Sequence, residues 1–216
     1  MKLFVWDFHG VLEKGNDRAV EEISNSVLGA NGYSQRFTMK EIELLYGKKW
    51  FEYFQRILPH EPHETHIKLQ EACFEFSNSK PEIIARYIKS NDHATDVLDA
   101  INDTHQQILI SNTRPDALRM FIASVGLEKY FPSGKYFAAD AHRSAPINKN
   151  KLELLIEFLE GKTFDSVVVI GDSVRDMELA SVANGISYLY ALPGKAFPEC
   201  LAQYKIRDLR EVLREL

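Results

Sequence analysis

Three clusters of polar residues each follow a short apolar stretch of this 216-residue chain. The first contains Asp7 and His9 in DFHGVL, the second is the SNT triplet at 111–113, and the third contains Asp172 and Asp176 in GDSVRD. If the apolar stretches are parallel strands of one sheet, their carboxyl ends meet at one edge, where open α/β sheets bind ligands. The sequence therefore predicts one site built from distant parts of the chain.

The residue types in these clusters indicate metal-assisted chemistry. Carboxylates held close together repel one another unless a cation neutralises them, and hard oxygen ligands suit Mg²⁺. Asp172 and Asp176 are four residues apart, so a helical first turn lets both carboxylates face Asp7. Phosphoryl transfer fits such a site. Asp7 would attack phosphorus in line and form an aspartyl-phosphate, while Mg²⁺ would offset charge on the equatorial oxygens.

The phosphate group would also need hydrogen-bond donors and positive charge. Ser111, Asn112 and adjacent backbone N–H groups would hold it, helped by a helix N-terminus near Asp116. A lysine should supply the remaining positive charge. Lys149 is the first choice because it begins the helical pattern that leads into VVVIGD, and Lys151 is the second choice.

The apolar stretches predict the elements that position these residues. Strands are expected at Leu3–Trp6, Gln107–Ile110, Tyr136–Ala138 and Val167–Ile170. Their continuous apolar character suits parallel strands that are covered on both faces. Helical patterns at 116–125, 149–160 and 176–184 each end at a glycine. This alternation predicts an α/β fold, a Rossmann-like parallel sheet with helices on both faces.

Residues 14–95 interrupt the alternation. They contain no convincing strand, and their helical patterns lie at Ala19–Leu28, Lys40–Tyr46, Trp50–Leu58, His63–Ser77 and Pro81–Ser90. A segment of about 80 residues is too long for a simple crossover. We therefore expect a helical cap at 14–95, inserted into a core made of 1–13 and 96–216. A cap that leaves and returns at the carboxyl edge can close a site against water.

Composition and charge disfavour several other classes of protein. The net charge of −5 argues against general nucleic-acid binding, which needs a basic face. No apolar run approaches the roughly 18 residues of a membrane span. The start MKLFVWD reaches a carboxylate too soon for a signal peptide, and Cys73 and Cys200 lack metal-ligand spacing. We expect a cytoplasmic protein that works without nucleic acid or membrane.

The motifs resemble those of a known family. DFHGVL resembles the nucleophile loop of the haloacid dehalogenase (HAD) superfamily, which usually reads D-x-D-G-[TV]. ISNTRPDALRMFIASVGLEKYF and VVVIGDSVRDMELASVANGIS resemble the second and fourth motifs of its phosphoglycolate phosphatase and β-phosphoglucomutase branch. LLYGKKWFEYF resembles the cap segment that reaches into the active site in that branch. The resemblance implies an Mg²⁺-dependent phosphohydrolase of a small phosphorylated metabolite.

The resemblance also implies a set of metal ligands. Asp7, Asp172 and the backbone carbonyl of His9 would ligate Mg²⁺, and Asp176 would be a second or water-mediated carboxylate. Two positions depart from the family pattern. The usual lysine-proline pair is missing from SAPINKNK at 144–151, and His9 replaces the aspartate that protonates the leaving group and then activates water.

Three interpretations of His9 follow. In the first, His9 is the acid/base, because an imidazole can donate and accept a proton near neutral pH. In the second, the protein cleaves a carbon–phosphorus or carbon–halogen bond. The retained Asp172 and Asp176 argue against dehalogenation, while Lys48 and Lys49 keep open a Schiff base for carbon–phosphorus cleavage. In the third, the protein is a catalytically impaired HAD-like protein that binds ligands or regulates.

Overall fold

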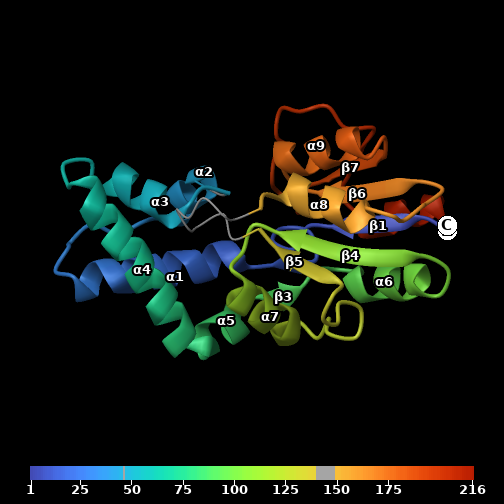
Figure 1. Ribbon diagram of the computed structural model, residues 1–216. Helices are drawn as coiled ribbons and strands as arrows, with labels where there is room; N and C mark the ends of the chain where they lie inside the picture. The colour runs from blue at the N-terminus through green and yellow to red at the C-terminus, as the bar shows by residue number, and fades with distance from the viewer. Residues whose placement is uncertain (46, 140–148) are drawn as a thin grey trace. The chain divides into compact units, whose positions relative to one another are not determined.

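The computed structural model of the protein describes residues 1–45, 47–139 and 149–216. The chain divides into two compact units. The core unit contains Met1–Lys14 and Lys89–Leu216, and the helical unit contains Gly15–Ile88. Figure 1 labels helices and strands of both units.

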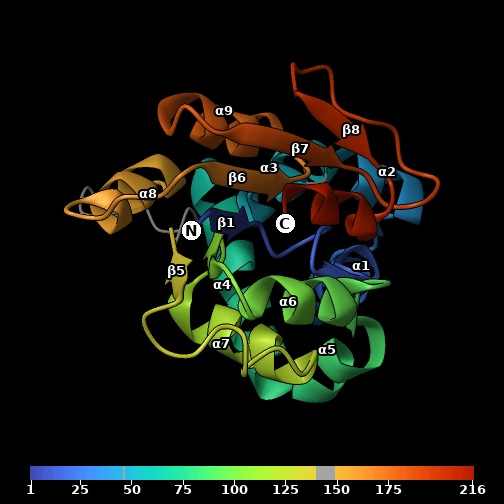
Figure 2. The same cartoon turned by 90° about the vertical axis from the view of Figure 1, so that its right-hand side faces the viewer.

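The core unit is built on a six-stranded sheet in which every pair of neighbouring strands is parallel. The strand order is β5-β4-β1-β6-β7-β8 (Figures 1 and 2). The strands are β1 (Leu3–Trp6), β4 (Gln106–Ser111), β5 (Tyr136–Ala138), β6 (Val167–Gly171), β7 (Ile186–Tyr190) and β8 (Tyr204–Ile206). The predicted parallel α/β fold is confirmed. The sheet also contains β7 and β8, which the sequence did not predict.

Helices cover both faces of this sheet (Figures 1 and 2). They are α6 (Ala94–Asn102), α7 (Pro115–Ser124), α8 (Lys151–Leu159), α9 (Val174–Val182) and the 3₁₀ helix η1 (Leu209–Glu215). Because side chains alternate along a strand, Leu3 and Val5 of β1 point to one face, where they belong to the same buried cluster as Leu155 of α8 and Leu179 of α9. Phe4 and Trp6 point to the opposite face and are also fully buried, so the central strand is apolar and buried on both faces.

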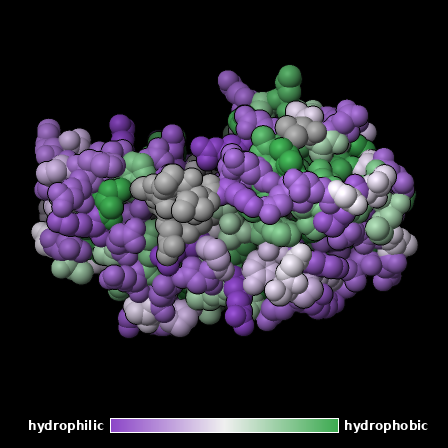
Figure 3. Space-filling model, in the orientation of Figure 1, coloured by the Kyte–Doolittle hydropathy of each residue, from purple (hydrophilic) through white to green (hydrophobic). Residues whose placement is uncertain are grey.

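The helical unit contains α1 (Asn16–Ala30), α2 (Met39–Leu45), α3 (Trp50–Ile57), α4 (His63–Ser79) and α5 (Pro81–Tyr87). Phe54, Leu69 and Cys73 are buried within it, and the face seen in Figure 3 is mostly hydrophilic. Gly15 opens this unit with a positive φ of 97°. A Cβ at this position would lie 2.1 Å from the carbonyl oxygen of Tyr87, so only glycine fits there. No helix in the described ranges is both long and apolar enough to cross a membrane.

The segment around residue 88 differs from the sequence prediction. The helix expected at Pro81–Ser90 ends at Tyr87, and β3 (Lys89–Ser90) follows it. β3 pairs antiparallel with β2 (Glu13–Lys14), so the expectation of no strand in 14–95 was wrong. Two-residue strands are too short to leave an alternating pattern. The helical unit consequently spans 15–88, whereas the sequence suggested a cap at 14–95.

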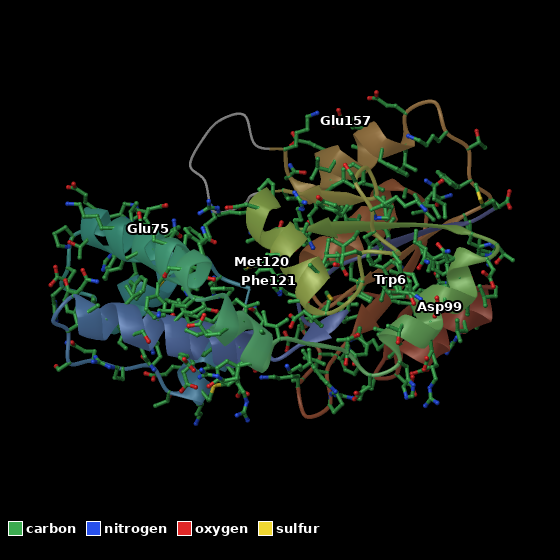
Figure 4. All side chains as sticks on the ribbon, turned by 90° about the horizontal axis from the view of Figure 1, so that it is seen from below. Trp6, Glu75, Asp99, Met120, Phe121 and Glu157 are labelled. Atoms are coloured by element: carbon green, nitrogen blue, oxygen red, sulfur yellow. The ribbon has the colours of Figure 1, made fainter. Side chains whose placement is uncertain are left out.

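A buried polar chain ties β1 to β4 and α6. The indole Nε1 of Trp6 donates to Oε1 of Gln107 at 3.1 Å, and Nε2 of Gln107 donates to the Leu98 carbonyl at 2.9 Å. Trp6, labelled in Figure 4, is fully buried, and Gln107 is 1% exposed. Gln107 therefore satisfies two buried polar groups that water does not reach.

We expect Gln107→Ala to lower the free energy of unfolding by about 2–3 kcal/mol, because the Trp6 N–H and the Leu98 carbonyl lose their partner. Gln106→Ala is the matched control. Gln106 is the preceding residue of the same strand and is partly exposed, so its loss should stay within about 0.5 kcal/mol. Urea unfolding of both variants measures the difference, and equal losses would contradict this role for Gln107.

Candidate active site

The three polar clusters lie at the carboxyl ends of neighbouring strands. Asp7 directly follows β1, and its backbone N–H donates to the carbonyl of Ile170 in β6 at 2.9 Å. Ser111 is the last residue of β4, and Asp172 directly follows β6. Because β1 lies between β4 and β6, the sheet places these residues side by side at one edge.

Three carboxylates and one lysine form the centre of this edge. Asp7, Asp172 and Asp176 each offer a carboxylate oxygen, and these oxygens lie within 4.8 Å of one another. The ammonium of Lys151 bridges two of them, with Nζ at 2.6 Å from Oδ1 of Asp7 and at 2.7 Å from Oδ1 of Asp176. Asp7, Asp176 and Lys151 are all buried. The single positive charge of Lys151 thus faces up to three negative charges in a buried site.

The pKa values in this cluster reflect both burial and charge. Burial raises the pKa of Asp7 to about 6 against the opposing charge of Lys151, and the charge of Asp176 adds to the rise. Burial also raises the pKa of Asp172, as do the charges of Asp7 and Asp176. Burial by itself would lower the pKa of Lys151, but the charges of Asp176 and Asp7 outweigh it and raise that pKa. Lys151 therefore stays protonated.

Asp176 has two roles in the local structure. It is the third residue of α9, and its Oδ2 accepts hydrogen bonds from the backbone N–H and the hydroxyl of Ser173, the N-cap, at 3.1 and 2.6 Å. Its Oδ1 accepts from Lys151. The approach to β6 is tight, since a Cβ on Gly171 would lie 2.1 Å from the Cβ of Asp176. Glycine is therefore required at position 171.

The carboxylate cluster fits a hard divalent cation such as Mg²⁺. Within the described part of the chain, the carboxylate of Asp172 has no hydrogen-bond or ion-pair partner, so it can bind a cation without giving up another contact. Raised carboxyl pKa values are what uncompensated negative charge in a buried place produces. Both oxygens of Asp176 already accept hydrogen bonds, which favours a water-mediated contact to a metal for this residue.

The loop after β4 carries hydroxyl groups and backbone donors. The hydroxyls of Ser111 and Thr113 are hydrogen-bonded at 3.0 Å, and both residues are buried. Asn112 lies between them and is partly exposed. The next helix, α7, begins at Pro115. This loop and the first turn of α7 offer the donors that an oxyanion needs.

The imidazole of His9 is held by a residue that the sequence analysis missed. Its Nδ1 lies 2.9 Å from Oε1 of Glu13, which is fully buried. The rings of Phe8 and Phe121 pack nearly perpendicular to it, with centroid distances of 5.1 and 5.0 Å. Phe121, labelled in Figure 4, comes from α7. The spacing of four residues between His9 and Glu13 is the feature of the sequence that could have indicated this contact.

A family model for haloacid dehalogenase-like hydrolases matches residues 1–184. The chain belongs to the HAD-like hydrolase family. This match confirms the resemblance drawn from the motifs at Asp7 and Asp172. A comparison with curated proteins finds no match.

Solved structures of HAD proteins share this fold at low sequence identity. A predicted phosphoglycolate phosphatase from Haemophilus somnus has a TM-score of 0.77 and 13% identity, with 99% of this chain and 96% of that chain covered. A HAD-like family protein from Streptococcus pneumoniae has a TM-score of 0.74 and 14% identity, with 99% and 97% covered. A HAD family hydrolase from Deinococcus radiodurans, solved with bound phosphate and sodium, has a TM-score of 0.67 and 17% identity, with 97% and 92% covered.

In this HAD hydrolase, Lys151 is the lysine that reaches the carboxylate cluster. The sequence suggested Lys149 first and Lys151 second, so the order of the two is reversed. Lys149 is exposed and pairs with Glu157, which Figure 4 labels at the outside of α8. Asn150 is the N-cap of α8, so the helix begins at Lys151 and not at Lys149. The N-x-x-E pattern of Asn150 and Glu153, a capping box, could have identified the right lysine.

Lys48 and Lys49 lie in the helical unit. Lys48 forms an ion pair with Glu52 at 3.7 Å, and its side chain is 56% exposed. Lys49 is the N-cap of α3, and its backbone N–H donates to Glu52 at 2.8 Å. Their contact with a substrate stays a prediction.

Lys151→Met should lower the free energy of unfolding by about 3–5 kcal/mol at pH 7.5 without divalent metal, because Asp7 and Asp176 lose a buried partner. The loss should shrink at pH 5. A carboxyl whose pKa is raised by folding favours the folded state below that pKa, and this benefit disappears as the pH rises through it. Lys151 lowers the pKa of Asp7, so in the variant this pKa lies above its wild-type value of about 6, and repulsion is relieved between pH 7.5 and 5. Urea unfolding at both pH values measures this.

Lys149→Met is the matched control for this prediction. Its ion pair with Glu157 is exposed, so the change should stay below about 1 kcal/mol. An equal loss in the two variants, or a loss in Lys151→Met that does not depend on pH, would contradict the assignment of Lys151 to the cluster.

Proposed function

We propose that this HAD hydrolase is an Mg²⁺-dependent phosphatase that acts on a small phosphorylated metabolite through an aspartyl-phosphate on Asp7. The observation that carries this proposal is the cluster of Asp7, Asp172 and Asp176 around Lys151 at the carboxyl ends of β1 and β6. Such a cluster suits a phosphoryl group. The phosphoryl oxygens can accept hydrogen bonds from the lysine, and they can bind the same divalent cation as the carboxylates.

In the first half of the reaction, a carboxylate oxygen of Asp7 attacks phosphorus and the bond between phosphorus and the ester oxygen breaks. His9 gives a proton to the departing oxygen, so the alcohol leaves neutral. In the second half, His9 takes a proton from water as the water oxygen attacks phosphorus. The acyl-phosphate bond then breaks, which restores Asp7 and releases inorganic phosphate.

Asp7, Asp172 and the backbone carbonyl of His9 would hold Mg²⁺, with Asp176 in contact through water. When bound, Mg²⁺ supplies charge stabilisation for the phosphoryl oxygens. Lys151 holds the phosphoryl group. Its ammonium is fixed in place by the hydrogen bond to Asp176. Ser111, Asn112 and nearby backbone N–H groups bind the remaining oxygens. Lys48 and Lys49 of the helical unit remain our candidates for contacts with the rest of the substrate.

The wild-type protein should hydrolyse phosphomonoesters in a screen with Mg²⁺, and Asp7→Asn should lower kcat by about 10³-fold or more because the nucleophile is lost. His9→Ala should lower kcat by about 10²–10⁴-fold. Asp99→Asn is the matched control, since Asp99 is exposed on α6 and pairs with Lys129. Phosphate release measured over a panel of small phosphorylated compounds gives these values.

Activity retained in Asp7→Asn would overturn the mechanism. His9→Asp separates the interpretations of the histidine. A much faster turnover in His9→Asp than in wild type would show that the native histidine slows an impaired enzyme, and a slower turnover supports His9 as the acid/base.

Addition of Mg²⁺ at about 100 times its dissociation constant should stabilise the protein by about 2.7 kcal/mol at pH 7.5. The gain should be smaller at pH 5, because the raised pKa values of Asp7 and Asp172 let protons compete with the metal there. Asp172→Asn should remove the gain and should make the metal-free protein more stable at pH 7.5, since one repelling charge is gone. Urea unfolding with and without Mg²⁺ tests this, and an Mg²⁺ effect that survives in Asp172→Asn would contradict the site.

A further inference from the structure

We propose that Glu13 is a positioning residue that holds the His9 imidazole with its proton on Nδ1 and leaves Nε2 to exchange the proton with the substrate oxygen and water. This inference rests on the proposed function, because it assigns the partner that an imidazole needs in the acid/base position. Nothing in the motif resemblance assigns a role to residue 13.

The hydrogen-bond pattern around Glu13 supports the role. Oε1 of Glu13 lies 2.9 Å from Nδ1 of His9 and 3.1 Å from the backbone nitrogen of Gly10. The backbone N–H of Gly10 can only donate, so Oε1 is an acceptor in this arrangement. An ionised carboxylate has no proton to give, so with Glu13 ionised this geometry places the proton on Nδ1 of His9, which donates to the same oxygen.

The other ring nitrogen is left available. Among the residues that the structure describes, Nε2 of His9 forms no hydrogen bond, and the side chain keeps 20% of its surface exposed. In a neutral imidazole with Nδ1 protonated, Nε2 has the lone pair that accepts a proton. Through both halves of the reaction, one proton remains on Nδ1 of His9, hydrogen-bonded to Glu13. Only the proton on Nε2 moves.

The backbone holds the carboxylate and the imidazole together. The N–H groups of Val11, Leu12 and Glu13 all point to the carbonyl of Phe8, at 3.3, 3.0 and 3.2 Å. This tight loop brings Glu13 back beside His9 and buries its side chain completely. The rings of Phe8 and Phe121 pack nearly perpendicular to the imidazole, which restricts its plane but does not choose between its nitrogens.

The chemistry of histidine explains why a second carboxylate is needed. An aspartate in the acid/base position has two equivalent oxygens, and either one can carry the proton. An imidazole has two different nitrogens and is useful only when the right one faces the substrate. In the first half of the reaction the imidazole gives the proton on Nε2 to the leaving oxygen, while the proton on Nδ1 remains hydrogen-bonded to Glu13.

The test compares the ring nitrogens of His9 and the kinetics in Glu13→Leu and Glu13→Gln. Nitrogen-15 NMR of the metal-free protein, at one pH where the imidazole is neutral, distinguishes the two tautomers. The His9 signals are assigned by their loss in His9→Gln. Wild type should show the proton on Nδ1, and Glu13→Leu should show a shift of population toward a proton on Nε2.

Glu13→Leu should also lower kcat by about 10²-fold while KM changes by less than about twofold, because proton transfer is affected and substrate binding is not. Glu13→Gln keeps an oxygen that accepts from Gly10 and Nδ1. It should therefore retain the wild-type tautomer and lose only about tenfold in kcat, which a merely structural role for Glu13 does not predict. Glu128→Leu is the matched control at an exposed glutamate and should change neither readout.

The outcomes separate this inference from the proposed function. A proton on Nε2 in wild type, or an active Glu13→Leu with unchanged kcat, would overturn the positioning role while leaving the phosphatase intact. If wild type shows the proton on Nδ1 but hydrolyses no phosphomonoester, the proposed function fails and the role of Glu13 in holding the ring stands. If Glu13→Leu does not fold, the tautomer seen in wild type and Glu13→Gln still decides the question.

Discussion

The repulsion among three buried carboxylates is the constraint on which the site depends. Asp7, Asp172 and Asp176 come together where water is largely excluded, and Lys151 offsets only part of their charge. A fold gains nothing from such an arrangement in the absence of a ligand, because each carboxylate is costly to desolvate. The rest of the core must therefore supply the free energy that holds these groups in place.

That free energy comes from the sheet. β1 is apolar on both faces and pairs with β4 and β6 along its whole length, so its end cannot shift without exposing Leu3, Phe4, Val5 or Trp6. A slip of one residue would turn every one of these side chains to the opposite face. The position of Asp7 is thus determined by the packing of the strand that ends directly before it, and the same argument applies to Asp172 after β6.

The sequence predicted the strands and site residues that strong local patterns determine. It missed the features that depend on the exact start of a helix or on the path of a loop. The apolar runs located β1, β4, β5 and β6, and polar residues at their ends located Asp7 and Asp172. The choice between Lys149 and Lys151 depended on one helix cap, which a helical pattern with soft ends does not resolve. β7 and β8 were missed because ISYLY and YKI mix polar with apolar residues near the sheet edge. Glu13 was missed because its role arises from a tight loop and not from periodicity.

The pairing of β2 with β3 has a consequence for how the chain folds. β1 must pair with β4, which lies about 100 residues later, and closing so long a loop has an entropic cost that grows with its length. The antiparallel contact of Glu13 with Ser90 and of Lys14 with Lys89 brings the two ends of the inserted segment together. Once that ribbon and the helices between its strands have formed, β1 and β4 are separated by a much shorter effective loop. The entropic cost of closing the insertion then falls on the pairing of β2 with β3, and β4 joins β1 across a much shorter stretch of chain.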